Sequence, residues 1–209
     1  GGPTSMRIND HIGKRRGLKT LLKAHSGKHG LDSEYGEIRS TTFNGTTSNV
    51  VFGTAATWQA LIGTGGTSKM TFSMWAKLDD NGIQSFISLG DVTTGGIHLE
   101  TRTSRKIRFE VVWDGTKEEW DTAADVYTVG SLHHIVLSYD ATSHTNSPKL
   151  YIDGALISWG TSASPSSPFS GITSDAGWIG NDVASGNKAI NGTLDEVAIW
   201  NKVLTASEV

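Results

Sequence analysis

The feature that most constrains this fold is a series of short apolar–polar alternations separated by turn residues. In residues 69–78, "KMTFSMWAKL", Met, Phe, Met and Ala hold one set of alternate positions, and Thr, Ser, Trp and Lys hold the other. Similar short segments recur about every ten residues, at 85–90, 96–101, 106–113, 133–140, 149–158, 177–180 and 192–200. No helical period separates them. The pattern predicts an all-β fold, an antiparallel two-sheet sandwich or jelly roll.

Turn and cap signals add detail to this prediction. "DDNG" at 79–82 and "IDGA" at 152–155 carry the Asn-Gly and Asp-Gly pairs typical of β-hairpins. "TWQALI" at 57–62 suggests one helical turn. "TASE" at 205–208 matches the capping box that opens a helix, and since little chain follows it, we expect a piece of a longer protein.

Size and composition agree with one β domain. The chain has 209 residues, with 25 glycines and 4 prolines, which suits many strands joined by tight turns. It has no cysteine, which excludes disulfides and thiolate metal sites, and no apolar run approaches the ~20 residues of a membrane span. "GGPTS" before Met6 is typical of an expression scar.

Charge is concentrated at the N-terminus. Residues 1–29 carry seven basic and one acidic side chain, whereas the whole chain has a formal net charge of −3. The basic segment at 14–29 could dock on an acidic partner or on nucleic acid, or it could be a solubilising linker, which we favour. Because the rest of the chain is acidic, nucleic acid is not expected to be the chief partner.

Five segments together resemble the laminin-G-like jelly rolls of the concanavalin A-like lectin and glucanase superfamily. They are "FNGTTSNVVF", "MTFSMWAKL", "SLHHIVLSYD", "KLYIDGALI" and "INGTLDEVAIWNKVLTASEV". The resemblance covers residues 38–209 and implies two curved antiparallel sheets packed face to face, with residues 1–37 as a basic arm or linker. The family usually has Trp before the His pair, where this chain has Leu132, so we expect one weaker core contact.

The acidic residues do not match the glucanase branch of that superfamily. That branch places three acids alternately on one strand, as Glu-x-Asp-x-Glu, and retaining hydrolysis needs two carboxyls ~5 Å apart. Here Glu119 and Asp121 alternate, but Ala123 holds the third position. Asp195 and Glu196 are adjacent, so in a regular strand they point to opposite faces, and Glu196 is expected to anchor a basic or hydroxyl group. The sequence therefore predicts no enzyme.

The resemblance implies a structural calcium ion instead. Family members often bind calcium where the first and last strands pair, through carbonyls of an early turn and an Asp of the closing Asp-Glu motif. These positions match Asn44, Gly45 and Asp195, and calcium accepts such oxygen ligands. The alternative is that Asp195 only accepts backbone N–H bonds across the terminal strands.

The aromatic residues suggest a ligand site. Trp75, Trp178 and Trp200 fall in family strands and are expected to pack in the core or against a sheet. The remaining candidates fall at strand ends or in loops, where an indole can stack on a sugar ring with acids beside it: Trp113, Asp114, Trp120, Asp121 and Trp159. Packing within loops is the competing interpretation. His133 and His134 lie on opposite faces of one strand, so they are not expected to bind one metal together.

Three classes of function remain. The first is a non-catalytic module that binds glycan or a protein surface in an extracellular or surface assembly. The second is a structural module of a virion or adhesin, docked through the basic arm. A glycoside hydrolase comes third. The fold supports the first but does not by itself imply it.

Overall fold

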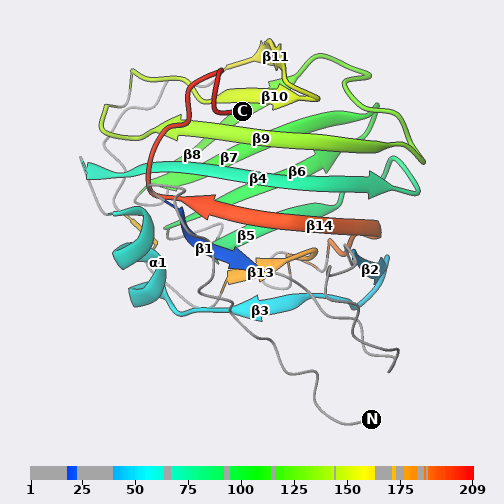
Figure 1. Cartoon of the computed structure of the whole chain (residues 1–209), viewed down its shortest axis with the longest axis horizontal. Coiled ribbons are helices and arrows are strands. Elements are labelled where there is room, and N and C mark those ends of the chain that lie inside the picture. The colour runs from blue at the N-terminus through cyan, green and yellow to red at the C-terminus, as the bar shows by residue number, and fades with distance from the viewer. Residues whose placement is uncertain are drawn as a thin grey trace, which may run out of the picture.

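The computed structural model describes residues 18–22, 40–63, 67–91, 95–113, 116–143, 145–162, 171–172, 177–182, 186 and 188–209. They form two antiparallel sheets of seven strands each, with one sheet in front of the other in Figure 1. The all-β sandwich expected from the alternation is confirmed. In the described part of the chain, no helix has the length and apolar character needed to span a bilayer.

Sheet A contains the last strand of the chain and its neighbours. Its path is β1-β14-β4-β9-β10-β11, and β2 also pairs with β14. The bounds are β1 (Leu18–Leu22), β2 (Thr41–Asn44), β4 (Lys69–Leu78), β9 (Leu132–Asp140), β10 (Lys149–Ile152), β11 (Ala155–Ile157) and β14 (Asn191–Trp200).

Sheet B is built around three consecutive hairpins. Its order is β12-β8-β7-β6-β5-β13-β3. The bounds are β3 (Val50–Phe52), β5 (Ser85–Asp91), β6 (Gly95–Arg102), β7 (Lys106–Trp113), β8 (Thr116–Thr122), β12 (Trp159–Thr161) and β13 (Gly177–Ile179).

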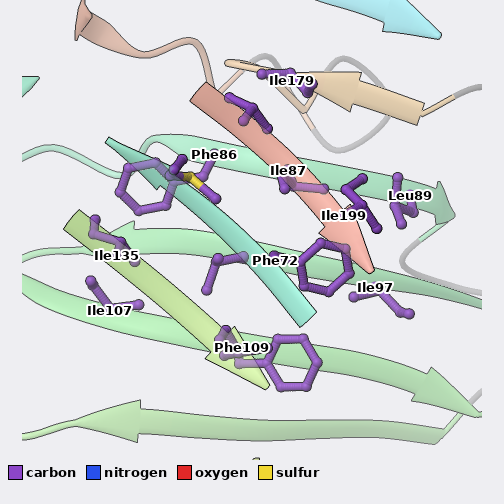
Figure 2. Close-up of a cluster of buried hydrophobic side chains, with 14 of the residues drawn as sticks. Phe72, Phe86, Ile87, Leu89, Ile97, Ile107, Phe109, Ile135, Ile179 and Ile199 are labelled. Carbon is purple, nitrogen blue, oxygen red and sulfur yellow. The ribbon is translucent and has the colours of Figure 1, made fainter. Parts of the chain in front are cut away.

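The core fills the space between the sheets. Figure 2 shows Phe72, Ile135 and Ile199 of sheet A beside Phe86 and Phe109 of sheet B, and all five are at most 1% exposed. The alternation within each strand turns these residues inward and their polar neighbours outward. Each sheet therefore has an outer face on which functional side chains can lie.

The short helix α1 (Ala55–Ile62) confirms and lengthens the turn expected at 57–62. Thr54 is its N-cap, and the Thr54 hydroxyl accepts a hydrogen bond from the Thr57 backbone N–H. Trp58 and Ile62 of this helix are buried in the main core. The helix thus adds apolar area at one end of the sandwich.

The two hairpin predictions have different outcomes. Asp153 and Gly154 both have positive φ, as a tight two-residue hairpin requires, and they join β10 to β11. The "DDNG" hairpin is wrong, because β4 and β5 belong to different sheets. The Asp80 carboxylate accepts a hydrogen bond from the Gly82 backbone N–H at 2.8 Å, so this turn carries the chain from one sheet to the other.

The chain ends were expected to lie outside the sandwich or in a helix. Within the arm assigned to residues 1–37, Leu18–Leu22 instead form β1, which pairs with Val197–Trp200 of β14. At the other end, residues 206–208 form a turn rather than a helix. Half of the expected capping box is present there, because the Glu208 carboxylate accepts the Thr205 N–H at 2.9 Å.

Candidate functional site

A β-bulge interrupts β14 at the Asp-Glu motif. Asp195 pairs with Trp75 of β4, and the next pair along the strands joins Ala198 to Ser73, so β14 has one extra residue. Glu196 lies in the bulge with φ of +47°, a left-handed conformation that is uncommon for a non-glycine residue. The Glu196 backbone N–H donates to the Asp195 carboxylate at 2.8 Å, which stabilises the irregular turn of the chain.

The bulge changes which residues face the core. Leu194 and Val197 are both buried in the main core, although three positions apart they would face opposite sides of a regular strand. Asp195 and the exposed Glu196 both lie on the outer side. The expectation that these two carboxylates point to opposite faces is therefore wrong, because it assumed unbroken alternation. The expected anchoring of a basic or hydroxyl group by Glu196 is not observed among the residues that the structure describes.

Both carboxylates line an open cavity on the outer face of sheet A, which we call the Trp75 pocket. Its volume is about 500 Å³, within the usual range for ligand sites. Its lining residues are Ser40, Trp75, Lys77, Leu132, Thr193, Asp195 and Glu196. They come from β14, β4, β9 and the segment before β2, so the pairing of these strands fixes the positions of most of them.

Trp75 supplies the aromatic wall of this pocket. Its side chain is 37% exposed and stacks on His134 of β9, with ring centroids 5.0 Å apart and an interplanar angle of 28°. His134 is itself held by a 2.9 Å hydrogen bond between Nε2 and the Ser73 hydroxyl. Burial lowers the pKa of His134, so the imidazole is neutral at pH 7. The indole is thus fixed before any ligand arrives.

The Asp153 carboxylate of the β10–β11 turn supports this arrangement. It accepts the His134 backbone N–H at 2.9 Å and contacts His133 Nδ1 at 2.7 Å. His133 Nε2 accepts the Thr128 N–H, so Nδ1 carries the proton and donates it to Asp153. The two histidines lie on opposite faces, as expected, and both serve in hydrogen bonds.

The outer face of sheet B carries a different kind of polar surface. Arg108 of β7 contacts two carboxylates of β8: its guanidinium donates two bonds to Asp121, each of 2.7 Å, and one to Glu119 at 2.6 Å. The hydrogen bond from Arg108 lowers the pKa of Asp121. Burial acts to raise the pKa of Glu119, but Lys117 and Arg108 outweigh it and the net change is downward. Both carboxylates are therefore ionised and neutralised by their neighbours.

The same face continues inward as a buried network. Glu110 is 2% exposed, and burial raises its pKa although Lys117 lies 2.8 Å from it. On β6, Glu100 is 1% exposed and its carboxylate accepts a 2.6 Å bond from Lys188. His98 lies 3.3 Å from the buried Asp182. Most charges of this face are satisfied within the protein, which favours a structural role.

Of the sequence-predicted ligand residues, those that the structure describes belong to sheet B, where they are used in core packing, a backbone hydrogen bond or ion pairs. Trp120 is wrong as a platform, because it is 0% exposed and packs in the core against Phe109 and Tyr139. Trp159 is half-buried against that core, and its indole N–H donates to the Pro148 carbonyl at 2.7 Å. Asp121 is held by Arg108. The Trp113 side chain and Asp114 lie outside the described residues.

The residues matched to a calcium site do not come together. The Asn44 side-chain oxygen Oδ1 accepts three backbone N–H groups, from Thr46, Thr47 and Ser48. Asn44 pairs with Asn191, and Asp195 lies four positions further along β14, about 13 Å away at the strand rise per residue. Calcium ligands must all lie within ~2.6 Å of the ion, so Asn44, Gly45 and Asp195 do not fit one site.

No other metal cluster replaces that site in the part of the chain that the structure describes, where no three His, Asp or Glu residues are arranged to hold an ion. Calcium binding itself stays a prediction from the resemblance.

The sequence interpretation missed Trp75, Leu132 and Lys77 as site residues. Trp75 was expected to pack in the core or against a sheet. It holds the same set of alternate positions as Thr71, Ser73 and Lys77 and therefore lies on the outer face of sheet A. Leu132 was expected to weaken a core contact, but it is 57% exposed and opposes Lys77 across the β4–β9 pair. The alternation along β4 was enough to predict that Trp75 faces outward. The pocket also depends on the bulge in β14, which alternation does not predict.

Comparison with known families gives one match that covers most of the chain. The laminin-G-type family model described as "Concanavalin A-like lectin/glucanases superfamily" matches residues 40–209. No curated protein matches at a significant level.

Solved structures share the fold at low sequence identity. The Ruminococcus gnavus IT-sialidase CBM40 bound to α2,3-sialyllactose is 20% identical, with a TM-score of 0.59 over 83% of this chain and 97% of that one. Domain 4 of AbnA, an extracellular arabinanase from Geobacillus stearothermophilus in complex with arabinotriose, is 18% identical, with a TM-score of 0.54 over 99% and 86%. NanB sialidase from Streptococcus pneumoniae is 17% identical, with a TM-score of 0.63 over 81% of this chain but 26% of that larger one.

Proposed function

We propose that this chain, which belongs to the concanavalin A-like lectin/glucanase superfamily, is a non-catalytic module that binds glycan in the Trp75 pocket. The observation that carries the proposal is an exposed indole, fixed by His134, in a cavity of about 500 Å³. Indole faces stack on the apolar faces of sugar rings, and carboxylates and hydroxyls at the rim accept or donate bonds to sugar hydroxyls.

Two similar structures support this class of ligand. One is a sialidase CBM40 bound to sialyllactose, and the other is an arabinanase domain in complex with arabinotriose. At 18–20% identity they show a shared fold, so the location of the site on this chain is argued from its own residues.

The charged face of sheet B is the competing location. Arg108, the group there that would recognise an acidic sugar, is 12% exposed and already binds two carboxylates. Within the described residues, in contrast, no ion pair holds Asp195 or Glu196. The Trp75 pocket therefore offers two carboxylates to a ligand without first breaking an ion pair among the described residues.

A lack of catalysis is part of this proposal, and the carboxylates of sheet B support it. A glycosidase needs a general acid with a raised pKa that touches the glycosidic oxygen. Glu119 and Asp121 have lowered pKa values. Glu110 has a raised pKa but is 2% exposed, so a sugar cannot reach it.

An extracellular or surface location fits a glycan-binding module and is part of this proposal. A partner for the basic arm at 14–29 would make the chain a structural module of an assembly. Most of that segment lies outside the described residues, so the glycan function is the better supported of the two.

A glycan array followed by titration calorimetry tests the proposal. We expect Trp75→Ala to weaken binding of the best glycan about tenfold or more, since truncating a central tryptophan commonly costs about 2 kcal/mol. Leu132→Trp should have a similar effect, because the larger side chain fills the pocket. Glu119→Gln, on sheet B, is the matched control and should bind normally. Binding lost in the control but kept in Trp75→Ala would move the site to sheet B.

A further inference from the structure

Among the described residues, the charges that line the Trp75 pocket are more negative than positive. Asp195 and Glu196 both line it, and the cation in its lining, Lys77, contacts Asp79 at 2.6 Å. The neighbouring imidazole, His134, is bonded to the Ser73 hydroxyl and has a lowered pKa, so it does not offset the carboxylates at neutral pH. A ligand in this pocket therefore meets two carboxylates, while the lysine beside them is already paired with Asp79.

The indole of Trp75 also favours a positively charged ligand. The face of an indole is the negative part of its quadrupole, and it attracts a cation placed within about 6 Å. Trp75 pairs directly with Asp195 across the β4–β14 ladder, so the indole and this carboxylate start from adjacent backbone positions. An ammonium group on a sugar ring would meet both.

We propose that the Trp75 pocket selects glycans that carry free amino groups, such as de-N-acetylated amino sugars, over neutral and acidic glycans. This inference rests on the proposed glycan-binding function and adds the substrate class. The sugar ring stacks on Trp75 while its ammonium group donates to Asp195 or Glu196. An acidic sugar such as sialic acid would place a third carboxylate beside these two and be repelled.

The bulge gives this selectivity a structural origin. In a regular β14 strand, Glu196 would point toward the core, opposite Asp195. The extra residue and the positive φ of Glu196 bring the second carboxylate to the pocket. This left-handed conformation costs energy for a non-glycine residue.

The experiment compares two hexasaccharides of equal length, one of glucosamine and one of N-acetylglucosamine, by titration calorimetry at pH 5.5. At this pH the amino groups of the glucosamine hexamer are protonated. We expect the glucosamine hexamer to bind about tenfold more tightly or better. Asp195→Asn and Glu196→Gln should each weaken it about three- to tenfold and weaken the acetylated hexamer distinctly less, as expected for charge-assisted bonds in a partly open site.

The matched control is Asp140→Asn. Asp140 lies at the far end of β9 from Leu132, eight positions away, and its loss changes the net charge by the same amount. Equal weakening by Asp140→Asn would show a general charge effect and overturn the inference. Circular dichroism and melting temperature confirm that each variant is folded.

The remaining outcomes separate this inference from the proposed function. If both hexamers bind equally, and Trp75→Ala abolishes both, the glycan function stands and the selectivity is wrong. Tighter binding of sialyllactose than of the glucosamine hexamer also overturns it. If no glycan binds, but a lysine-rich peptide binds and requires Asp195, then both proposals are wrong and the pocket recognises protein.

Discussion

At the scale of single residues, the tryptophan that matters most for stability is Trp120. It is 0% exposed and packs against Phe109 and Tyr139, with ring centroids 5.9 and 5.7 Å away. Its indole N–H is buried and has no hydrogen-bond partner among the described residues. The side chain thus contributes apolar contact while retaining an unpaired donor.

Trp120→Ala should destabilise the domain by about 3–5 kcal/mol, because it leaves a large cavity between the sheets. Trp120→Phe should cost distinctly less, since the ring still fills part of the space and the unpaired N–H disappears. Chemical denaturation measures both. Trp75→Ala is the control for a partly exposed tryptophan and should cost less than either. A Trp120→Ala variant as stable as the native protein would place this side chain outside the core.

The two tryptophans show how far the burial of a side chain can be predicted from sequence. In "KEEWDT", Glu119 and Asp121 flank Trp120, so alternation already places Trp120 on the inner face. In "FSMWAK", Trp75 shares its face with Ser73 and Lys77. Residue type alone had suggested a ligand platform for Trp120, and packing in the core or against a sheet for Trp75. Strand phase was the more reliable signal, because neighbouring side chains in a strand must face opposite sides.

At the scale of secondary-structure elements, β14 contains a bulge that the alternation of side chains along a strand does not predict. The outward set runs Thr193 and Asp195, then shifts by one residue to Ala198 and Trp200. Nothing in "TLDEVAIW" marks the shift, since Glu196 is not a glycine and adopts positive φ without a sequence signal. The strand was therefore predictable, whereas the pocket that its bulge creates was not.

The ion pairs between β7 and β8 predict that the stability of the domain depends on pH. The pKa values of Asp121 and Glu119 are lower in the folded state than in the unfolded chain, with Arg108 as partner. Carboxylates with a lowered folded pKa stabilise the protein above their unfolded pKa, near pH 4, and this stabilisation is lost as pH falls through the folded pKa.

Replacing Arg108 should reveal this dependence. We expect Arg108→Met to lower stability at pH 7 by about 2–3 kcal/mol, because two half-buried carboxylates lose their charged donor. The difference in stability between the native protein and the variant should shrink as pH falls below about 4, because protonated carboxyls no longer need the guanidinium. Melting curves from pH 7 to pH 2.5 measure it. A gap that stays constant over this range would mean that Arg108 stabilises by packing rather than by charge.

At the scale of the whole molecule, the two-sheet architecture followed from the sequence because it depends on many strands at once. Each strand from 69 onward carried its own alternation, so errors at one turn, such as "DDNG", did not change the sandwich. The edge of sheet A was harder to predict, because β1 lies in a basic, glycine-interrupted segment without a clear period. Its pairing depends on the free edge that β14 offers, a property of the assembled sheet.

The last prediction concerns that edge. Removing residues 1–29 deletes β1 and leaves Val197–Trp200 of β14 without a partner on that side, while β4 still pairs with the other side. Since the family match begins at residue 40, we expect the melting temperature to fall by only a few degrees. The exposed edge should instead promote self-association, because its N–H and C=O groups can pair with another chain. Light scattering over a range of concentrations measures this. A truncated domain that stays monomeric at all of them would show that β14 is protected without β1, and one that fails to fold would make β1 essential to the sandwich.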